Sequence, residues 1–269
     1  MSIDENPEIF RKVARAAAQA AGEILRANWR LPKAIGYKGA IDLVTSADRD
    51  SERKIIEVIR HSFPDHSILA EEESDIQSAQ SEYRWIVDPL DGTTNFAHGY
   101  AQFCVSIALE QSGRVIFGLV YDPLRDECFE AALGQGATLN GAALRVSTVS
   151  ELDKALLATG FPYDRRDFAD FYLGYFKEFM IRCQGIRRAG SAALDLCYVA
   201  CGRFDGFWEL KLKPWDIAAG ALIVAEAGGT LSDFSGEPFS INGRETLASN
   251  GLIHEEMTCV AAAVKQNPR

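Results

Sequence analysis

Residues 85–95 read Trp-Ile-Val-Asp-Pro-Leu-Asp-Gly-Thr-Thr-Asn, and more depends on this stretch than on any other part of the chain. Its apolar start predicts a strand that delivers Asp88 at the C-terminal end, and Pro89 fixes the turn that carries Asp91. Two carboxylates therefore converge at one strand tip. Gly92 allows a close backbone approach, and the hydroxyl and N–H groups that follow it can hold an anion. An Asx-Pro turn with a threonine cap is the alternative, but the length of the motif favours a site for metal and phosphate.

The composition excludes several classes of protein. The 269 residues are 47% hydrophobic and 25% charged, which is enough to bury a large core, and 22 glycines are too few for a fibrous or low-complexity chain. Asp and Glu number 38 against 28 Lys and Arg, and the resulting net charge of −10 argues against nucleic acid as a partner. A phosphorylated small molecule can still bind if a metal ion lies between its phosphate and the carboxylates.

The N-terminus, Met-Ser-Ile-Asp-Glu-Asn, lacks the basic and apolar regions of a secretory signal, so we expect a cytoplasmic protein. The longest apolar run, residues 217–225, falls well short of the roughly 20 residues that span a membrane, so no membrane is expected as a partner. The six cysteines are expected to remain free, buried thiols. Neither they nor the four histidines show the spacing of a zinc site, so any metal should be bound by oxygen.

Hydrophobic periodicity divides the chain into two halves. In residues 1–150 we expect a helix from Asn6-Pro7, a second helix opened by Thr45-x-x-Asp48, and a hairpin turn at Asn140-Gly141. The strands expected in this half are 41–44, 67–70, 85–87, 103–109, 115–121 and 128–132. Residues 151–269 alternate as α/β, with strands at 155–158, 185–188, 204–208, near 230 and at 246–249, and helices at 167–182, 191–201, 215–226 and from 253. An α+β half of residues 1–150 and an α/β half of 151–269 should form one compact body, with a soft boundary.

Further acids and small residues follow predicted strands or open predicted helices. Glu71 comes directly after strand 67–70 and is a candidate metal ligand, although a solvated acidic loop is the default interpretation of such a run of acids. Asp48 completes a capping box, and Asp216 lies in the first turn of a helix that begins at a proline, so both have a structural explanation too. The turn at Gly190 can approach a substrate or simply pack tightly.

Two other motifs point to chemistry that we discount. The spacing Cys197-x5-Arg203 matches that of cysteine phosphatases, but Cys197 repeats with its apolar neighbours at helical intervals, and a helix interior offers no cradle for phosphate. Gly134-x-Gly136 lacks the third glycine of a dinucleotide-binding loop and leads into the predicted hairpin.

Taken together, five strings resemble the inositol monophosphatase family in order and spacing, over nearly the whole chain. They lie at residues 42–48, 71–72, 85–96, 190–192 and 214–220. The resemblance implies a layered α-β-α-β-α sandwich, mixing α+β and α/β, of the type shared by inositol monophosphatases and fructose-bisphosphatases. It also implies a homodimer and two or three Mg²⁺ ions per subunit, for which oxygen ligands are the chemically suited donors.

The resemblance further assigns ligands to those ions. Glu71, Asp88 and the carbonyl oxygen of Leu90 would hold a first Mg²⁺, and Asp88, Asp91 and Asp216 a second, with Glu71 again contributing to a weaker third. Thr93, paired with Asp48, would act together with Glu71 to orient and deprotonate the attacking water.

The substrate contacts come from the same resemblance. Gly92 and Thr93 would hold the phosphate, while Asp91, Ala192 and Glu209 would contact polyol hydroxyls beside Gly190. An acid at Glu209 suits a neutral polyol and disfavours a second anionic group.

The expected activity is the Mg²⁺-dependent hydrolysis of a phosphate monoester, with myo-inositol monophosphate giving inositol and phosphate through a metal-activated water and without a covalent phosphoenzyme. Inhibition by lithium is implied as well. The alternatives on the same metal core are phosphatases for fructose 1,6-bisphosphate, 3′-phosphoadenosine 5′-phosphate or histidinol phosphate. A regulator that binds transcription machinery or RNA is the alternative outside the enzymes.

Overall fold

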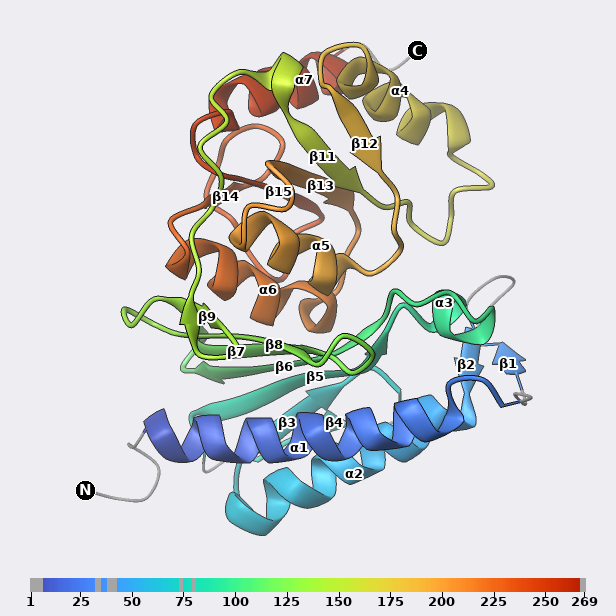
Figure 1. The fold of residues 1–269 in the computed structure, drawn as a ribbon, viewed down its shortest axis with the longest axis vertical. Coiled ribbons are helices and arrows are strands. Elements are labelled where there is room, and N and C mark those ends of the chain that lie inside the picture. The colour runs from blue at the N-terminus through green and yellow to red at the C-terminus, as the bar shows by residue number, and fades with distance from the viewer. Residues whose placement is uncertain (1–6, 32–34, 38–42, 73–74, 79–80, 267–269) are drawn as a thin grey trace.

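The computed structural model describes residues 7–31, 35–37, 43–72, 75–78 and 81–266, and its helices and sheets stack in five layers (Figure 1). Helices α1 (Pro7–Asn28) and α2 (Ser46–Ser62) form the first layer, and an eight-stranded sheet the second. Helices α5 (Ala192–Ala200) and α6 (Pro214–Glu226) form the middle layer, a five-stranded sheet the fourth, and α4 (Ala169–Met180) with α7 (His254–Gln266) the last. The expected α-β-α-β-α sandwich is therefore confirmed.

The larger sheet is built from the first half of the chain. Its strands are β3 (Ser67–Ala70), β4 (Asp75–Ile76), β5 (Tyr83–Asp91), β6 (Cys104–Gln111), β7 (Arg114–Asp122), β8 (Glu127–Ala132), β9 (Ala137–Leu139) and β10 (Ala142–Ala143). They lie in the order β10-β9-β8-β7-β6-β5-β3-β4, and only the pair β3 and β5 is parallel. A separate antiparallel pair, β1 (Ile35–Tyr37) and β2 (Leu43–Thr45), lies beside the short helix α3 (Thr93–Ala97) in Figure 1.

The smaller sheet is built from the second half. It contains β11 (Leu156–Thr159), β12 (Gly185–Arg187), β13 (Gly206–Leu210), β14 (Thr230–Ser232) and β15 (Glu245–Ser249), in the order β12-β11-β13-β15-β14. Strand β11 is parallel to both of its neighbours, whereas β15 is antiparallel to β13 and β14. The two sheets thus belong to different halves of the sequence, and the proposed boundary near residue 150 falls between their strands.

The strands of the larger sheet bury both faces, because they are covered on one side by α1 and α2 and on the other by α5 and α6. On β5, Trp85 and Val87 face the core shared with α1 and α2, and Ile86 between them faces the core shared with α5 and α6. Such two-sided burial explains why the strand segments read as nearly continuous apolar runs in the sequence. A third core lies between the smaller sheet and helices α4 and α7.

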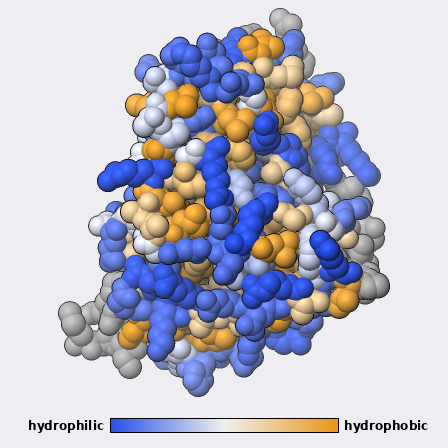
Figure 2. Space-filling view, in the orientation of Figure 1, coloured by the Kyte–Doolittle hydropathy of each residue, from blue (hydrophilic) through white to orange (hydrophobic). Residues whose placement is uncertain are grey.

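A close approach between β7 and α6 positions the middle layer. A Cβ added to Gly118 would lie 2.8 Å from the backbone oxygen of Ala219, so only glycine admits the helix at this distance. On the face shown in Figure 2, hydrophilic side chains predominate over α1 and α2, and apolar and polar side chains are interspersed over the upper half.

Most elements expected from the sequence are present, and the differences have identifiable reasons. The capping box of α2 and the Asn140-Gly141 hairpin turn are confirmed. The expected N-cap Asn6 and residues 41–42 of the expected strand lie outside the described residues. Strands β1 and β4 were not predicted, because two or three residues carry no periodicity.

The described helices include none that is long and apolar enough to cross a membrane. All six cysteines are free thiols. The expectation of buried thiols is confirmed for Cys104 and Cys197 only. Cys128, Cys183 and Cys201 are half-buried, and Cys259 on α7 is exposed, so the expectation was wrong for Cys259.

Candidate active site

The carboxylates of the 85–95 stretch lie where β5 leaves its regular pairing. The register between β5 and β6 shifts between Asp88 and Asp91, because Pro89 interrupts the ladder. The Oδ1 atom of Asp88 accepts a hydrogen bond from the N–H of Leu90 at 2.9 Å, and both residues are buried. The irregularity thus turns two acids three positions apart toward one cavity.

Asp91 joins the larger sheet to the start of α5. Its Oδ2 atom accepts hydrogen bonds from the Oγ of Ser191 and from the N–H of Ala193, both at 2.7 Å. Burial raises the pKa of Asp91 to about 6, even though these two hydrogen bonds favour the ionised form. The carboxylate therefore has one oxygen held by the second half of the chain.

The turn after Asp91 requires a glycine. Gly92 has φ +97°, and a Cβ there would lie 2.8 Å from the backbone oxygen of Gln102. The left-handed backbone allows α3 to begin at once with Thr93, whose side chain returns toward α2.

Thr93 and Asp48 form a buried pair. The Oγ1 of Thr93 donates toward Oδ1 of Asp48 and toward the backbone oxygen of Leu90, each at 3.0 Å. The other oxygen of Asp48 accepts from the N–H of Thr45 at 2.9 Å and from its hydroxyl at 2.5 Å. Burial raises the pKa of Asp48, while the hydrogen bonds lower it. Asp48 therefore caps α2 and also accepts a hydrogen bond from Thr93, and its catalytic role stays a prediction.

The remaining candidate ligands, Glu71 and Asp216, line the same cavity as Asp88 and Asp91. Glu71 follows β3, which is parallel to β5, so both strands end at one edge of the sheet. Asp216 lies in the first turn of α6, and its Oδ2 accepts from the N–H of Lys213 at 2.7 Å. The solvated acidic loop is thus not needed to explain Glu71.

These acids repel one another. Burial raises the pKa of Asp88 well above its usual range, and the charges of Glu71, Asp91 and Asp216 raise it further. Burial likewise raises the pKa of Asp216. A cation among them would relieve this repulsion, and the donors are hard oxygens, as Mg²⁺ requires. Within the described residues no group of three His, Cys, Asp or Glu side chains is arranged as a ready metal-binding group. The donor chemistry fits, and the individual ligand assignments stay predictions.

The opposite wall of the cavity comes from the second half of the chain. Gly190, with φ +89°, is followed by Ala192 at the start of α5, and both line the cavity. Glu209 lies on β13, and burial raises its pKa to about 8. Its carboxylate occupies the space above Gly160, where a Cβ would lie 2.1 Å from Oε2.

Two residues of this wall were missed by the sequence analysis. Asp195 is a buried acid inside α5, and Arg188 precedes the Gly190 turn. The isolated acid among apolar residues 192–200 was a usable signal. No local pattern points to Arg188, because it follows β12, and its place beside the Glu209 strand depends on the order β12-β11-β13.

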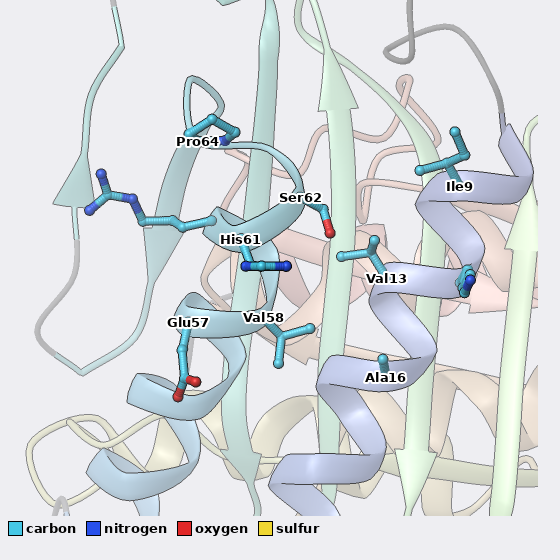
Figure 3. A pocket seen from close by; sticks show the side chains of 10 residues that line it. Ile9, Val13, Ala16, Glu57, Val58, His61, Ser62 and Pro64 are labelled. Atoms are coloured by element: carbon cyan, nitrogen blue, oxygen red, sulfur yellow. The ribbon is translucent and has the colours of Figure 1, made fainter.

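All the candidate site residues except the buried Asp48 line this one cavity of about 560 Å³. Asp48 lies behind it and reaches it through Thr93. A larger cavity, of about 950 Å³, lies elsewhere, in a groove between α1 and α2. Figure 3 shows Ile9 and Val13 of α1 on one side of that groove and Val58 and Ser62 of α2 on the other. Its lining includes a single carboxylate, so the chemistry described above belongs to the smaller cavity.

Comparison with known proteins shows similarity to one family over nearly the whole chain. A family model described as the inositol monophosphatase family matches residues 6–269. An inositol-1-monophosphatase from Synechocystis sp. is 47% identical over 260 residues, which cover 96% of this chain and 91% of the relative. Nus factor SuhB of Escherichia coli is 47% identical over 226 residues, which cover 83% of this chain and 85% of the relative.

A solved structure of a related protein has a similar fold over nearly the whole chain. The extragenic suppressor protein suhB from Bartonella henselae has a TM-score of 0.91 and 40% identity, with 94% of this chain and 98% of that chain covered. A five-layered sandwich with this cluster of acids between its sheets defines a class of phosphatases. Within that class, the chain belongs to the inositol monophosphatase family.

Proposed function

We propose that this protein is a Mg²⁺-dependent phosphate monoesterase that hydrolyses myo-inositol monophosphate to inositol and phosphate. The observation that carries the proposal is that four carboxylates and the Thr93–Asp48 pair meet at one cavity. The carboxylates are those of Glu71, Asp88, Asp91 and Asp216. Family membership and the Synechocystis relative support the phosphatase activity.

The acids would hold the metal. Glu71, Asp88, Asp91 and Asp216 offer carboxylate oxygens, and Leu90 offers its carbonyl oxygen at the same strand tip. When bound, Mg²⁺ supplies Lewis acidity toward the phosphate oxygens and toward the water that attacks phosphorus. Two or three ions per subunit are the number that the family resemblance implies.

The Thr93–Asp48 pair would position the attacking water. Asp48 accepts the proton of the Thr93 hydroxyl, which leaves the lone pairs of Thr93 Oγ1 available to accept a hydrogen bond from water. Glu71, which lines the same cavity, is the second acceptor that we propose for this water. The water would attack phosphorus directly, since no serine, cysteine or aspartate is needed as a nucleophile.

The phosphate and the alcohol would bind on different sides of the acids. The backbone of Gly92 and Thr93 lies at the β5 end, suited to the phosphate. The alcohol would contact Asp91, Ala192 and Glu209 near Gly190, on the wall formed by α5 and β13. A neutral polyol suits this wall, because an acid at Glu209 disfavours a second anionic group.

The decisive experiment measures phosphate release from a panel of monoesters with Mg²⁺ and with EDTA. We expect hydrolysis of myo-inositol 1-phosphate only with Mg²⁺, a loss of about 10² or more in Asp88→Asn, and inhibition by lithium. Hydrolysis that persists in EDTA would contradict the metal mechanism. A stronger activity on fructose 1,6-bisphosphate, 3′-phosphoadenosine 5′-phosphate or histidinol phosphate would contradict the proposed substrate but support the proposed type of reaction.

A second candidate function is that of a regulator that binds transcription machinery or RNA. The name of the Escherichia coli relative, Nus factor SuhB, favours it, while the net charge of −10 disfavours direct RNA binding. Affinity purification with Asp88→Asn separates the two functions, because a regulatory complex should survive the loss of hydrolysis.

We also propose a homodimer and a cytoplasmic location. Exposed apolar side chains on and beside α4 support association with a second copy, namely Phe168, Phe171, Leu173, Met180 and Ile181. The six free thiols support a reducing compartment. Sedimentation analysis of the wild type and of Leu173→Lys tests the dimer.

A further inference from the structure

Asp195 is an acid without a visible structural purpose. It lies in the first turn of α5, is 1% exposed, and has only buried apolar neighbours in the helix. Among the residues that the structure describes, none makes a hydrogen bond with its Oδ1 atom. Yet Asp195 lines the cavity that holds the candidate catalytic residues.

A buried carboxyl group without a partner is costly, and native proteins seldom keep one without a reason. The other buried acids described here have partners. Asp205, for example, accepts from the hydroxyl of Ser147 at 2.5 Å and from the N–H of Leu156 at 2.6 Å. The exception at Asp195 therefore suggests that its partner is a group that enters the cavity.

The surroundings of Asp195 define the chemistry of that group. Burial raises the pKa of Asp195 well above its usual range, and the negative charge of Glu209 raises it further. Asp195 therefore favours its protonated form, in which the carboxyl group can both donate and accept a hydrogen bond.

Arg188 completes this end of the cavity. Its guanidinium lies 6.0 Å from the centre of the Phe161 ring, and a Cβ added to Gly190 would lie 2.7 Å from Nη1. Arg188, Asp195 and Glu209 line the same cavity, and the positive charge of Arg188 partly offsets the rise that burial causes in the pKa of both acids. This end of the cavity is therefore lined by polar groups that can form hydrogen bonds.

We propose that Asp195 is a specificity-determining residue that binds a hydroxyl group of the substrate alcohol, adjacent to the hydroxyl bound by Glu209. The inference rests on the proposed function, because it names a further contact in the same site. Adjacent hydroxyls on a ring both donate and accept, and a protonated carboxyl group offers them one donor and one acceptor. A phosphate ester whose ring carries no hydroxyl groups leaves Asp195 without a partner, and a site built for hydrogen bonds discriminates strongly against such an analogue.

The test compares two esters that share a six-membered ring. Myo-inositol 1-phosphate carries the hydroxyls, and cyclohexyl phosphate lacks them. In Asp195→Ala, the ratio of kcat/KM for the inositol ester to that for the cyclohexyl ester should fall about tenfold or more, mainly through KM. Asp195→Asn keeps the shape, one donor and one acceptor, so it should recover most of this ratio.

Thermal unfolding separates this role from a structural one. Asp195→Ala removes an unpartnered carboxyl, so the Tm should not fall, whereas Asp205→Ala removes a partnered one and should lower the Tm by about 5 °C or more. An unchanged ratio of the two esters in Asp195→Ala, with the wild type active on both, would overturn the assignment of Asp195 alone. A wild type that hydrolyses neither ester with Mg²⁺ would overturn the proposed function, and the assignment with it.

Discussion

Replacing Asp48 by asparagine should separate catalysis from stability, because the change preserves the shape of a side chain with two roles. If the amide oxygen takes the place of Oδ2, both hydrogen bonds from Thr45 remain. The amide nitrogen then faces Thr93, whose hydroxyl must accept from it and give its own proton to the carbonyl oxygen of Leu90, at 3.0 Å. Each polar group keeps a partner, but the hydroxyl of Thr93 now accepts a hydrogen bond from residue 48 instead of donating one to it.

The expected magnitudes follow from these contacts. Hydrogen bonds to a charged group contribute about 1.5–3 kcal/mol and neutral ones about 0.5–1.5, so the substitution weakens the cap. It also removes a buried charge, whose burial raises the pKa of Asp48, and the two effects oppose each other. The free energy of unfolding should therefore change by only about 1 kcal/mol. Loss of a correctly oriented proton acceptor should lower kcat by about 10²–10⁴.

The assay pairs phosphate release at saturating Mg²⁺ with urea unfolding. Asp122→Asn is the matched control, since Asp122 is a buried acid that accepts from the N–H groups of Leu124 and Arg125, outside the catalytic cavity. It should change stability without a comparable loss of kcat. If Asp48→Asn kept more than about a third of the wild-type kcat, or lost about 4 kcal/mol of stability, Asp48 would be a structural cap only.

Three further predictions follow from other contacts. Gly160→Ala should displace the Glu209 carboxylate and lower kcat/KM for myo-inositol 1-phosphate about as much as Glu209→Ala does. Gly174→Ala is the control, because its Cβ meets only an ordinary contact at 3.4 Å, and equal kinetics of the two glycine variants would contradict the prediction. Because the folded-state pKa of Glu209 is raised to about 8, the metal-free protein should lose stability in urea as pH rises from about 4 to 8, and Glu209→Gln should flatten that slope. Gly118→Ala forces a Cβ to within 2.8 Å of the backbone of Ala219, and unfolding in urea should show a loss of about 1–3 kcal/mol; a neutral effect would mean that α6 shifts freely.

Features with local causes could be predicted from the sequence. The capping box at Thr45 and Asp48 depends on residues three positions apart, and it is present as expected. Asn140 and Gly141 both adopt positive φ, as a two-residue hairpin turn requires. The apolar runs of the strands were recognisable because both faces of the larger sheet are buried.

Features with long-range causes could not be predicted from single patterns. Nothing local indicates that β3 is parallel to β5, yet this pairing brings Glu71 to the edge that carries Asp88. Glu209 entered the expectations only through family resemblance, and Asp195 did not enter at all. Both depend on how α5 packs beside β13, which residues far apart in the chain determine together.

The two walls of the catalytic cavity come from different parts of the chain, and this has a consequence for evolution. Apart from Asp216, the groups that would act on phosphorus come from residues 48–93, on and beside the larger sheet, whereas the wall facing the alcohol comes from residues 160–213. Hydrogen bonds from Ser191 and Ala193 to Asp91 join one wall to the other. The side chain of Asn95 adds hydrogen bonds to the backbone oxygens of Ala189 and Gly190. Substitutions in the second half can therefore change which alcohol is accepted while the hydrolytic groups stay in place. A new phosphatase could arise from this scaffold by inheriting its chemistry and altering a single wall.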